Sequence, residues 1–202
     1  MNYENKILSL FINGYLTTKD VNNNNIPRLY LTKLIKDNKI ERINRGLYIK
    51  KNEIADEFVI LQSKSKNAIY SNMTALYLYG FSNRIPIKYD ITINNGYNGS
   101  LQKEKDVNLF YIKQELLNIG VINYKLESGN TIKVYDLDKT ICDIIKNKKK
   151  VDSELFNKAI RKYFYSKEKN SLKLYEYAEK MNIYDKVRDT FEVLKWSKIK
   201  IH

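Results

Sequence analysis

The sequence predicts an α+β protein, with an N-terminal winged helix-turn-helix domain followed by a mixed α/β domain that ends in a helical bundle. Three observations indicate this fold class. Short amphipathic helices and then a charged, alternating hairpin pattern occupy residues 1–53. Strand and helix patterns alternate through the middle of the chain, and from about residue 138 only helical patterns occur. The expected domains are therefore residues 1–53 and 54–202.

The first domain is expected to begin with three helices. Apolar residues from Ile7 to Phe11 repeat at helical spacing, and Gly14 follows as a stop. Thr17 or Thr18 can cap a second short helix, which the asparagine run 22–25 ends. A third helix runs from Pro27 to about Asn38. Its apolar face is predicted to hold Tyr30, Leu31, Leu34 and Ile35.

A hairpin follows these helices. Residues 40–45 alternate between apolar and polar side chains, Gly46 interrupts the pattern, and residues 47–50 resume an extended one. A hairpin directly after the second helix of a helix-turn-helix is a wing. The first domain is thus expected to be a winged helix.

Positive charge is concentrated at the two ends of the chain. The formal net charge is +13. Residues 1–53 carry ten basic and five acidic side chains, residues 54–143 carry ten of each, and residues 144–202 carry sixteen basic and eight acidic ones. Such an excess favours a polyanionic partner, although a lysine-rich composition without a functional reason is the alternative.

In the first domain the excess falls on the third helix and the wing. With the apolar face turned inward, Arg28, Thr32 and Lys36 lie outward at a spacing of four, with Lys33 beside them. Arg28 and Thr32 are predicted to face base edges, and Arg42, Asn44 and Arg45 to flank a minor groove or phosphates. A solvated helix and a charged hairpin would be the simpler interpretation.

The second domain is predicted from shorter signals. Ser71 caps a helix that runs to Leu78, strands cover 89–93, 107–112 and 131–135, and Asp136 or Asp138 caps the next helix. The aromatic residues of the terminal helices are interpreted as core rather than as a platform for bases. A second basic patch could meet DNA phosphates, meet a partner protein, or be plain solvated surface. Its members are Lys148, Lys149, Lys150, Lys158, Arg161 and Lys162.

No catalytic site is expected. Cys142, the only cysteine, lies in an apolar run that predicts an inert buried thiol, and the single histidine is the last residue. A zinc finger or a histidine-dependent catalytic site is therefore not expected, nor is a metal or a cofactor. Asp136 and Asp138 are explained by capping, and Asp143 by exposure at the surface. The alternative is a nuclease with a winged-helix targeting domain.

No apolar run is long enough to span a membrane, and the N-terminus has an early acid and no small-residue cleavage site. A cytoplasmic protein is expected.

Several stretches resemble one known family in order and spacing. They are GYLTTKDV and INRGLYIKK in the first domain, and YSNMTALYLYGFSNRIP and VYDLDKTICDII in the second. The chain resembles the AbiEi antitoxins, the antitoxin half of the bacterial AbiE abortive-infection (phage defence) toxin–antitoxin systems. The resemblance implies a repressor that binds inverted repeats in its own promoter, and a C-terminal domain that counteracts a nucleotidyltransferase toxin.

The resemblance also implies site residues and partners. The family's DNA contacts would fall on Thr18, Arg28, Thr32, Lys33, Arg42, Asn44 and Arg45. The family is usually called type IV, which means that a stable complex with the toxin is not assumed. A monomer that binds double-stranded promoter DNA cooperatively is the expected state, and a plain transcriptional regulator is a further alternative.

Overall fold

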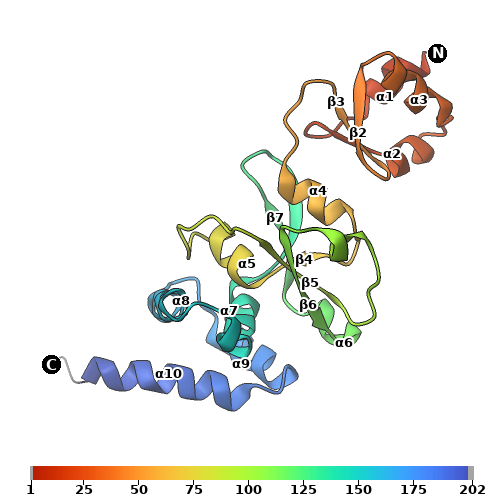
Figure 1. Ribbon diagram of the computed structural model, residues 1–202. Coiled ribbons are helices and arrows are strands. Elements are labelled where there is room, and N and C mark those ends of the chain that lie inside the picture. The colour runs from red at the N-terminus through yellow and green to blue at the C-terminus, as the bar shows by residue number, and fades with distance from the viewer. Residues whose placement is uncertain (1, 200–202) are drawn as a thin grey trace. The chain divides into compact units, whose positions relative to one another are not determined.

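The computed structural model describes residues 2–199, with side chains described to residue 194. Its backbone divides into two compact units (Figure 1). The first comprises Met1–Lys66 and Lys125–Ile132, and the second comprises Asn67–Tyr124 and Lys133–His202. Both units mix helices and strands, so the predicted α+β class is confirmed.

The first unit contains four helices and a small sheet among its described residues. They are α1 (Tyr3–Ser9), β1 (Tyr15–Thr17), α2 (Thr18–Asn23), α3 (Leu29–Lys36), β2 (Ile40–Asn44), β3 (Leu47–Lys50) and α4 (Glu57–Ser63). The sheet is antiparallel in the order β1-β3-β2. This order of elements, with the β2–β3 hairpin directly after α3, is consistent with the predicted winged helix-turn-helix.

Local signals explain where these helices begin and end. Thr17 and Asp20 form a capping box at the start of α2, in which each side chain accepts a hydrogen bond from the other residue's backbone N–H. Asn25 and Asn38 follow α2 and α3 with φ of 54° and 55°, in the left-handed region that asparagine tolerates. Short polar side chains thus set the limits of both helices.

Helices α1 to α3 enclose one apolar core, which side chains of β1 to β3 complete. Its buried members are Ile7, Leu16, Val21, Ile26, Leu31, Leu34, Ile40 and Tyr48. Leu31 and Leu34 come from the predicted inner face of α3, whereas Ile35 on the same predicted face is exposed. Because Ile35 lies at the edge of the apolar stripe, the helix turns it partly toward solvent.

The first unit extends past residue 53, the end predicted for the first domain. The reason is α4, in which the Ile60 carbonyl and the Ser63 hydroxyl accept hydrogen bonds from the amide of Asn44 on β2, each at 3.0 Å. The turn 125–132 also belongs to this unit, where Asn13 donates to the carbonyl of Gly129 at 2.7 Å. Interactions between distant segments therefore set this boundary.

The second unit is built on a mixed sheet in the order β6-β5-β4-β8-β7. The strands are β4 (Ile69–Tyr70), β5 (Tyr89–Asn94), β6 (Val107–Ile112), β7 (Val121–Lys125) and β8 (Thr131–Tyr135). The helices are α5 (Asn72–Leu78), α6 (Gln114–Leu117), α7 (Leu137–Lys146), α8 (Ser153–Tyr165), α9 (Ser171–Lys180) and α10 (Tyr184–Ile199). Two 3₁₀ turns are η1 (Ser100–Lys103) and η2 (Lys148–Lys150).

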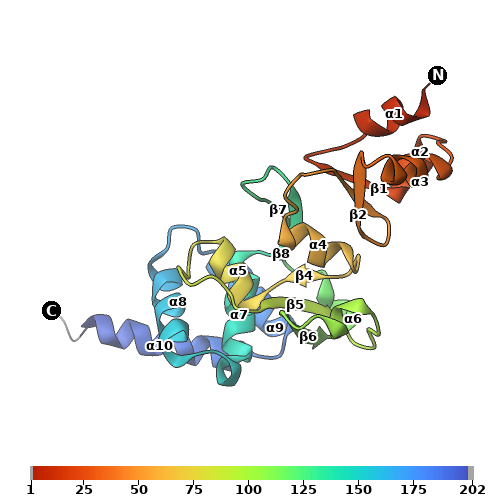
Figure 2. The ribbon, with the colours of Figure 1, turned by 45° about the horizontal axis from the view of Figure 1, so that its top comes forward.

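Helix α7 lies at the centre of the helical part, packed by α5, α8, α9 and α10 (Figures 1 and 2). Of the two predicted caps, Asp136 and Asp138, it is Asp136 that caps α7, where its side chain accepts a hydrogen bond from the N–H of Lys139 at 2.8 Å. Nine of its ten residues are buried, so this helix has no solvated face. Cys142 is fully buried within it, and burial raises the pKa of its thiol far above the ordinary value, as expected of an inert cysteine.

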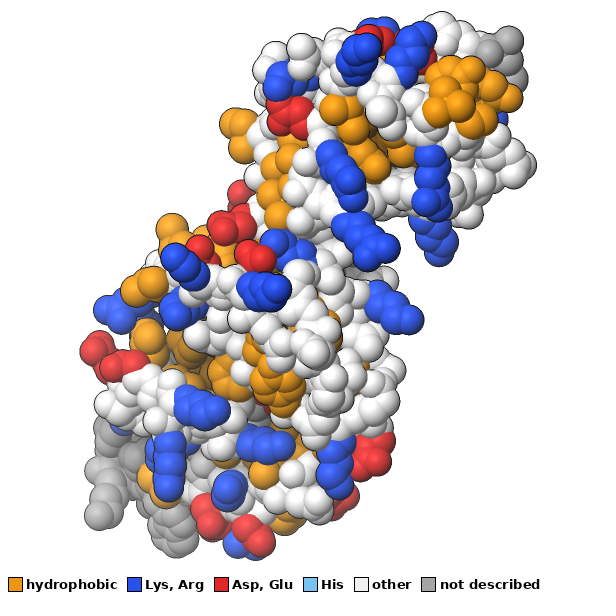
Figure 3. All heavy atoms as spheres, turned by 45° about the vertical axis from the view of Figure 1, so that its right-hand side comes forward, with side chains coloured by type: hydrophobic (Ala, Val, Ile, Leu, Met, Phe, Trp, Pro, Cys, Tyr) orange, Lys and Arg blue, Asp and Glu red, His pale blue; other side chains and the backbone are white. Residues whose placement is uncertain are grey.

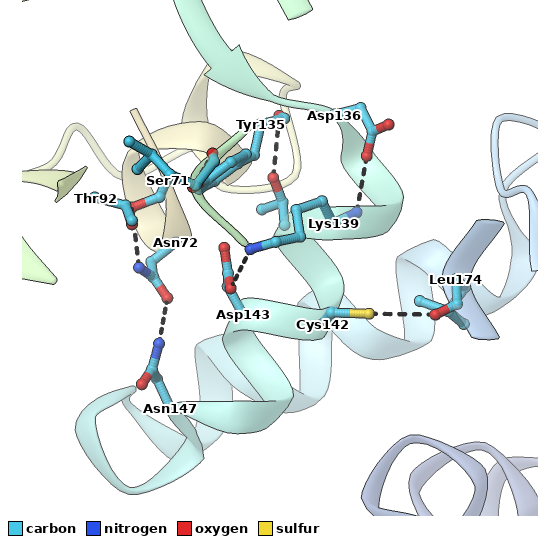
Figure 4. A network of polar contacts seen from close by, with 12 residues as sticks. Ser71, Asn72, Thr92, Tyr135, Asp136, Lys139, Cys142, Asp143, Asn147 and Leu174 are labelled. Carbon is cyan, nitrogen blue, oxygen red and sulfur yellow. Dashed lines mark hydrogen bonds and ion pairs between the residues drawn. The ribbon is translucent and has the colours of Figure 1, made fainter. Parts of the chain in front are cut away.

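Buried polar side chains accompany this apolar packing. Asp138 Oδ1 accepts hydrogen bonds from the Tyr163 hydroxyl at 2.5 Å and from the N–H of Asn170 at 2.9 Å. The sequence predicts Asp143 at the surface, but its side chain is buried and pairs with the fully buried Lys139 (Figure 4). That prediction is wrong because elements distant in sequence pack around α7.

Candidate nucleic-acid interface

The outer face of α3 presents polar and cationic side chains to solvent. Arg28, Thr32, Lys33 and Lys36 are all exposed. Leu31 and Leu34, on the opposite side of the helix, are buried. Arg28 occupies the N-cap position of α3, and its Nε donates to Asn22 Oδ1 at 3.0 Å. The structure thus places all four predicted α3 residues on the solvent side.

One of these cations already has an acidic partner. Lys33 Nζ lies 2.5 Å from Glu4, whose other carboxylate oxygen lies 3.1 Å from Lys39 Nζ. The hydrogen bonds from Lys33 and Lys39 lower the pKa of Glu4, and the bond to Glu4 raises the pKa of Lys33. Lys33 and Glu4 therefore both stay charged at neutral pH, and the carboxylate offsets part of the positive field.

The wing divides into buried and exposed side chains. Leu47, Tyr48 and Ile49 are buried and fix β3 to the core, while Arg42 and Arg45 are exposed. The pairing register of β2 shifts between Arg42 and Asn44, directly before the turn. An irregularity of this kind bends a strand and re-aims its side chains. Arg45 thus lies in the turn of the hairpin, and Arg42 lies on β2 with its Nε donating to the Asn44 carbonyl at 3.2 Å.

Asn44 and Thr18 face the protein rather than open solvent. Both residues are half-buried. The Asn44 amide donates to Ile60 and Ser63 of α4. The N–H of Thr18 donates to the carbonyl of Gly46 at 2.9 Å, which ties the start of α2 to the turn of the wing. These two predicted residues therefore position the wing.

The remaining predicted residues form one set of exposed side chains, here called the basic face. It consists of Arg28, Thr32, Lys33, Lys36, Arg42 and Arg45. Lys and Arg side chains stand out over the first unit, toward the top of Figure 3. A set of five cations around a helix and a hairpin offers the charge-assisted hydrogen bonds that phosphate oxygens accept.

The predicted second patch lies on η2 and α8. All six of its cations are exposed. Three of them contact aromatic rings: Lys148 lies 4.8 Å from the Phe156 ring centroid, Lys150 lies 5.5 Å from that of Phe110, and Lys162 lies 4.8 Å from that of Phe81. Lys158, Arg161 and Lys162 share one face of α8 through their spacing of three and four.

Neither a metal-binding cluster nor a membrane-spanning helix occurs in the described part of the chain. Between residues 2 and 199, no three His, Cys, Asp or Glu side chains come together as a group that could hold a metal ion. None of the helices in that range is long and apolar enough to cross a bilayer.

A hollow in the second unit has no signal in the local sequence. It lies beside Asp90 and Asp143, which come from β5 and α7. Because segments far apart in sequence form it, neither spacing nor composition points to these residues. Asp90 and Asp143 are distinguished by being buried acids, and their burial follows from the tertiary structure.

Comparison with known proteins gives a family match for residues 5–49 and a similar fold for the chain. No curated protein sequence matches. Among solved structures, the crystal structure of RV2827C protein from Mycobacterium tuberculosis is similar with a TM-score of 0.56 and 9% identity, over 89% of this chain and 72% of that one. At this identity the likeness shows the fold alone.

A family model described as "Transcriptional regulator, AbiEi antitoxin" matches residues 5–49. The match runs from α1 to β3 and contains every residue of the basic face. The resemblance to the AbiEi antitoxins is thereby confirmed over residues 5–49, which match a family of antitoxin transcriptional regulators.

Proposed function

We propose that the protein represses its own operon by binding promoter DNA through the basic face. The main supporting observation is that five of the seven exposed cations of the matched segment lie on α3, its N-cap and the wing; the other two are Lys19 and Lys39. In a winged helix, the second helix of the helix-turn-helix enters the major groove and the wing contacts the flanking backbone. Arg28 and Thr32, at the start of α3, are assigned to base edges. The phosphates are assigned to Lys33, Lys36, Arg42 and Arg45.

Asn44 and Thr18 are given an indirect part in this proposal. Both hold the wing in position. Asn44 does so through its side-chain amide, so its replacement should weaken binding by loosening the hairpin. Thr18 does so through its backbone N–H, which a substitution of its side chain retains. The operator is expected to be an inverted repeat, as the resemblance implies. A chain that binds each half-site as a monomer would give cooperative saturation of the full repeat.

Binding can be measured by fluorescence anisotropy with duplexes from the region upstream of the gene. Arg28→Ala and Arg45→Ala should weaken binding, and each should reduce the dependence of log K on log salt by about 0.9 for every phosphate that the variant no longer neutralises. Lys51→Ala is the matched control, because it removes one exposed cation that already pairs with Glu41. Equal affinities for the two arginine variants and the wild type would contradict the assignment.

We also propose that the second unit counteracts a nucleotidyltransferase toxin, through its basic patch and without catalysis. The support is the exposed patch on α8 and the antitoxin description of the family. The full chain carrying Lys158→Glu and Arg161→Glu should lose protection against the neighbouring toxin and keep its affinity for DNA. Lys186→Glu, an exposed charge reversal on α10, is the control. Chelator-sensitive cleavage of plasmid DNA by the purified chain would refute the non-catalytic part.

A further inference from the structure

One aliphatic side chain lies near the centre of the exposed face of α3. Leu29, the first residue of this helix, is 63% exposed. At about 100° of rotation per residue, Leu29 lies about 170° around the helix axis from the midpoint of the buried Leu31 and Leu34. It is therefore on the side of the helix away from the core, where an amphipathic pattern predicts a polar residue.

Exposure alone does not single out Leu29, because isolated aliphatic side chains are common on protein surfaces. Ile12 and Ile54 of the same unit are 70% and 99% exposed, and both lie outside α3 and the wing. Leu29 instead follows Arg28 directly and lies one helical turn before Thr32, so it is surrounded by residues of the basic face. These neighbours, rather than its exposure, distinguish it from the other two.

The long cations beside Leu29 are held by other helices. Arg28 Nε donates to Asn22 Oδ1 on α2 at 3.0 Å. Lys33 Nζ lies 2.5 Å from a carboxylate oxygen of Glu4 on α1. Because their charged ends are fixed there, the aliphatic stems of these cations leave the leucine uncovered, in agreement with its exposed fraction.

The same neighbours favour a polyanion over a protein partner. The exposed residues that follow Leu29 on the outer face of α3 are Thr32, Lys33 and Lys36, so this face carries no contiguous apolar patch. The cores of protein–protein interfaces are depleted of charged residues. A leucine flanked by cations suits a polyanion that also presents a small apolar group.

Duplex DNA has such a group in its major groove. Thymine carries a 5-methyl group there, which apolar side chains contact, whereas the edges of adenine, guanine and cytosine offer hydrogen-bonding groups. In a helix-turn-helix, the residues at the start of the second helix are the ones that reach base edges. Leu29 occupies that position on α3.

We propose that Leu29 reads a thymine of the operator by packing its side chain against the 5-methyl group in the major groove. This inference rests on the proposed function, which assigns the neighbouring Arg28 and Thr32 to base edges. Hydrogen bonds from those two residues fix the helix over the bases, and the leucine adds a preference for a methyl-bearing pyrimidine beside them.

A thymine-to-uracil scan tests the ligand. Deoxyuridine lacks the methyl group and keeps the hydrogen-bonding edge of thymine. Fluorescence anisotropy is measured with half-site duplexes, located by footprinting, in which each thymine is replaced in turn. The wild type should lose about fourfold in affinity at one position or more, as expected for one buried methyl group. At that position 5-methylcytosine should bind about fourfold more tightly than cytosine.

Two outcomes of the scan have different meanings. A wild type that binds the operator with the same affinity after every single replacement would overturn this inference and leave the proposed function intact. A wild type that binds no operator DNA would overturn the proposed function, and this inference with it.

Variants test the assignment to Leu29. Leu29→Ala should fold like the wild type, because the side chain is exposed and alanine favours a helix. It should bind the thymine and uracil duplexes equally well. Thr32→Ser removes the other methyl group of the outer face, and Ile12→Ala shortens an exposed aliphatic side chain outside α3. Both controls should keep the fourfold discrimination. Discrimination that survives in Leu29→Ala, or that disappears in Thr32→Ser, would overturn the assignment.

The salt dependence separates this contact from the charged ones. Leu29→Ala removes no charge, so its slope of log K against log salt should equal that of the wild type, whereas Arg28→Ala should reduce the slope. A reduced slope for Leu29→Ala would mean that the substitution displaces the neighbouring cations, and would overturn the assignment.

Discussion

Replacing Lys139 with methionine tests how strongly the second unit depends on one buried ion pair. Lys139 is 0% exposed, and its Nζ lies 2.7 Å from Asp143 Oδ1 and 4.0 Å from the Tyr135 ring centroid. Methionine has a similar length and leaves little empty volume. The substitution removes the only described hydrogen-bond donor to the Asp143 carboxylate, which then stays buried with both oxygens unpaired.

The expected loss follows from that unpaired charge. Removing one partner of a buried ion pair costs about 3–5 kcal/mol of unfolding free energy. At about 4 °C per kcal/mol for a unit of this size, the midpoint of thermal unfolding should fall by roughly 12–20 °C. Adding Asp143→Leu removes the stranded carboxylate, and the double variant should recover to within about 1 kcal/mol of the wild type.

Urea unfolding of the two single variants and the double variant completes the thermodynamic cycle. Circular dichroism follows the helices of the second unit, and the denaturant slope shows whether the native state stays compact. The reasoning requires that the double variant be more stable than Lys139→Met alone. If the double variant is the least stable of the three, shape complementarity rather than the charge pair holds this part of the core.

Three further predictions concern single positions. Burial raises the pKa of Asp138, so the contribution of this residue to stability is present below its unfolded pKa of about 4 and is lost as pH rises through its folded pKa. Relative to the wild type, Asp138→Asn should therefore gain stability with rising pH. A difference in unfolding free energy that does not depend on pH would contradict this. Gly120 has a φ of 71°, and a Cβ added there would lie 2.6 Å from the Cβ of Lys139. Gly120→Ala should therefore lower the unfolding free energy measured in urea by about 1–3 kcal/mol. Gly80→Ala should cost less, because Gly80 has a similar φ of 67° but no atom within 4 Å of an added Cβ. Thr17→Val removes the cap of α2 and should cost about 1 kcal/mol, seen as faster hydrogen exchange in that helix.

Much of the secondary structure can be predicted because its signals are local. The strand predicted over residues 107–112 has the same bounds as β6, and Asp136 caps α7 through its own side chain. Helix α4 and strand β7 are not predicted, since each is a short element whose amphipathic pattern covers too few residues. In the structure α4 is held by hydrogen bonds from Asn44 of β2, and β7 is hydrogen-bonded to β8, the next strand along the chain.

The candidate interfaces likewise combine features that the local sequence predicts with features that depend on tertiary packing. Spacing alone indicates which residues of α3 face outward, because helical periodicity fixes the face. Spacing gives no indication that Asn44 bonds to α4, or that the hollow beside Phe110 joins residues of β5, β6 and α7. Both depend on how elements pack, so the local sequence does not encode them.

By itself, the sequence determined the class of the protein, the order of the three helices and the hairpin in residues 1–53, the placement of positive charge and the resemblance to the AbiEi antitoxins. Only the tertiary structure decided that Lys139 and Asp143 are an interior pair. Their spacing of four is that of an ordinary surface ion pair on a helix. Because other elements pack around α7, burial changes the pair from a weak solvated contact into a polar group of the core.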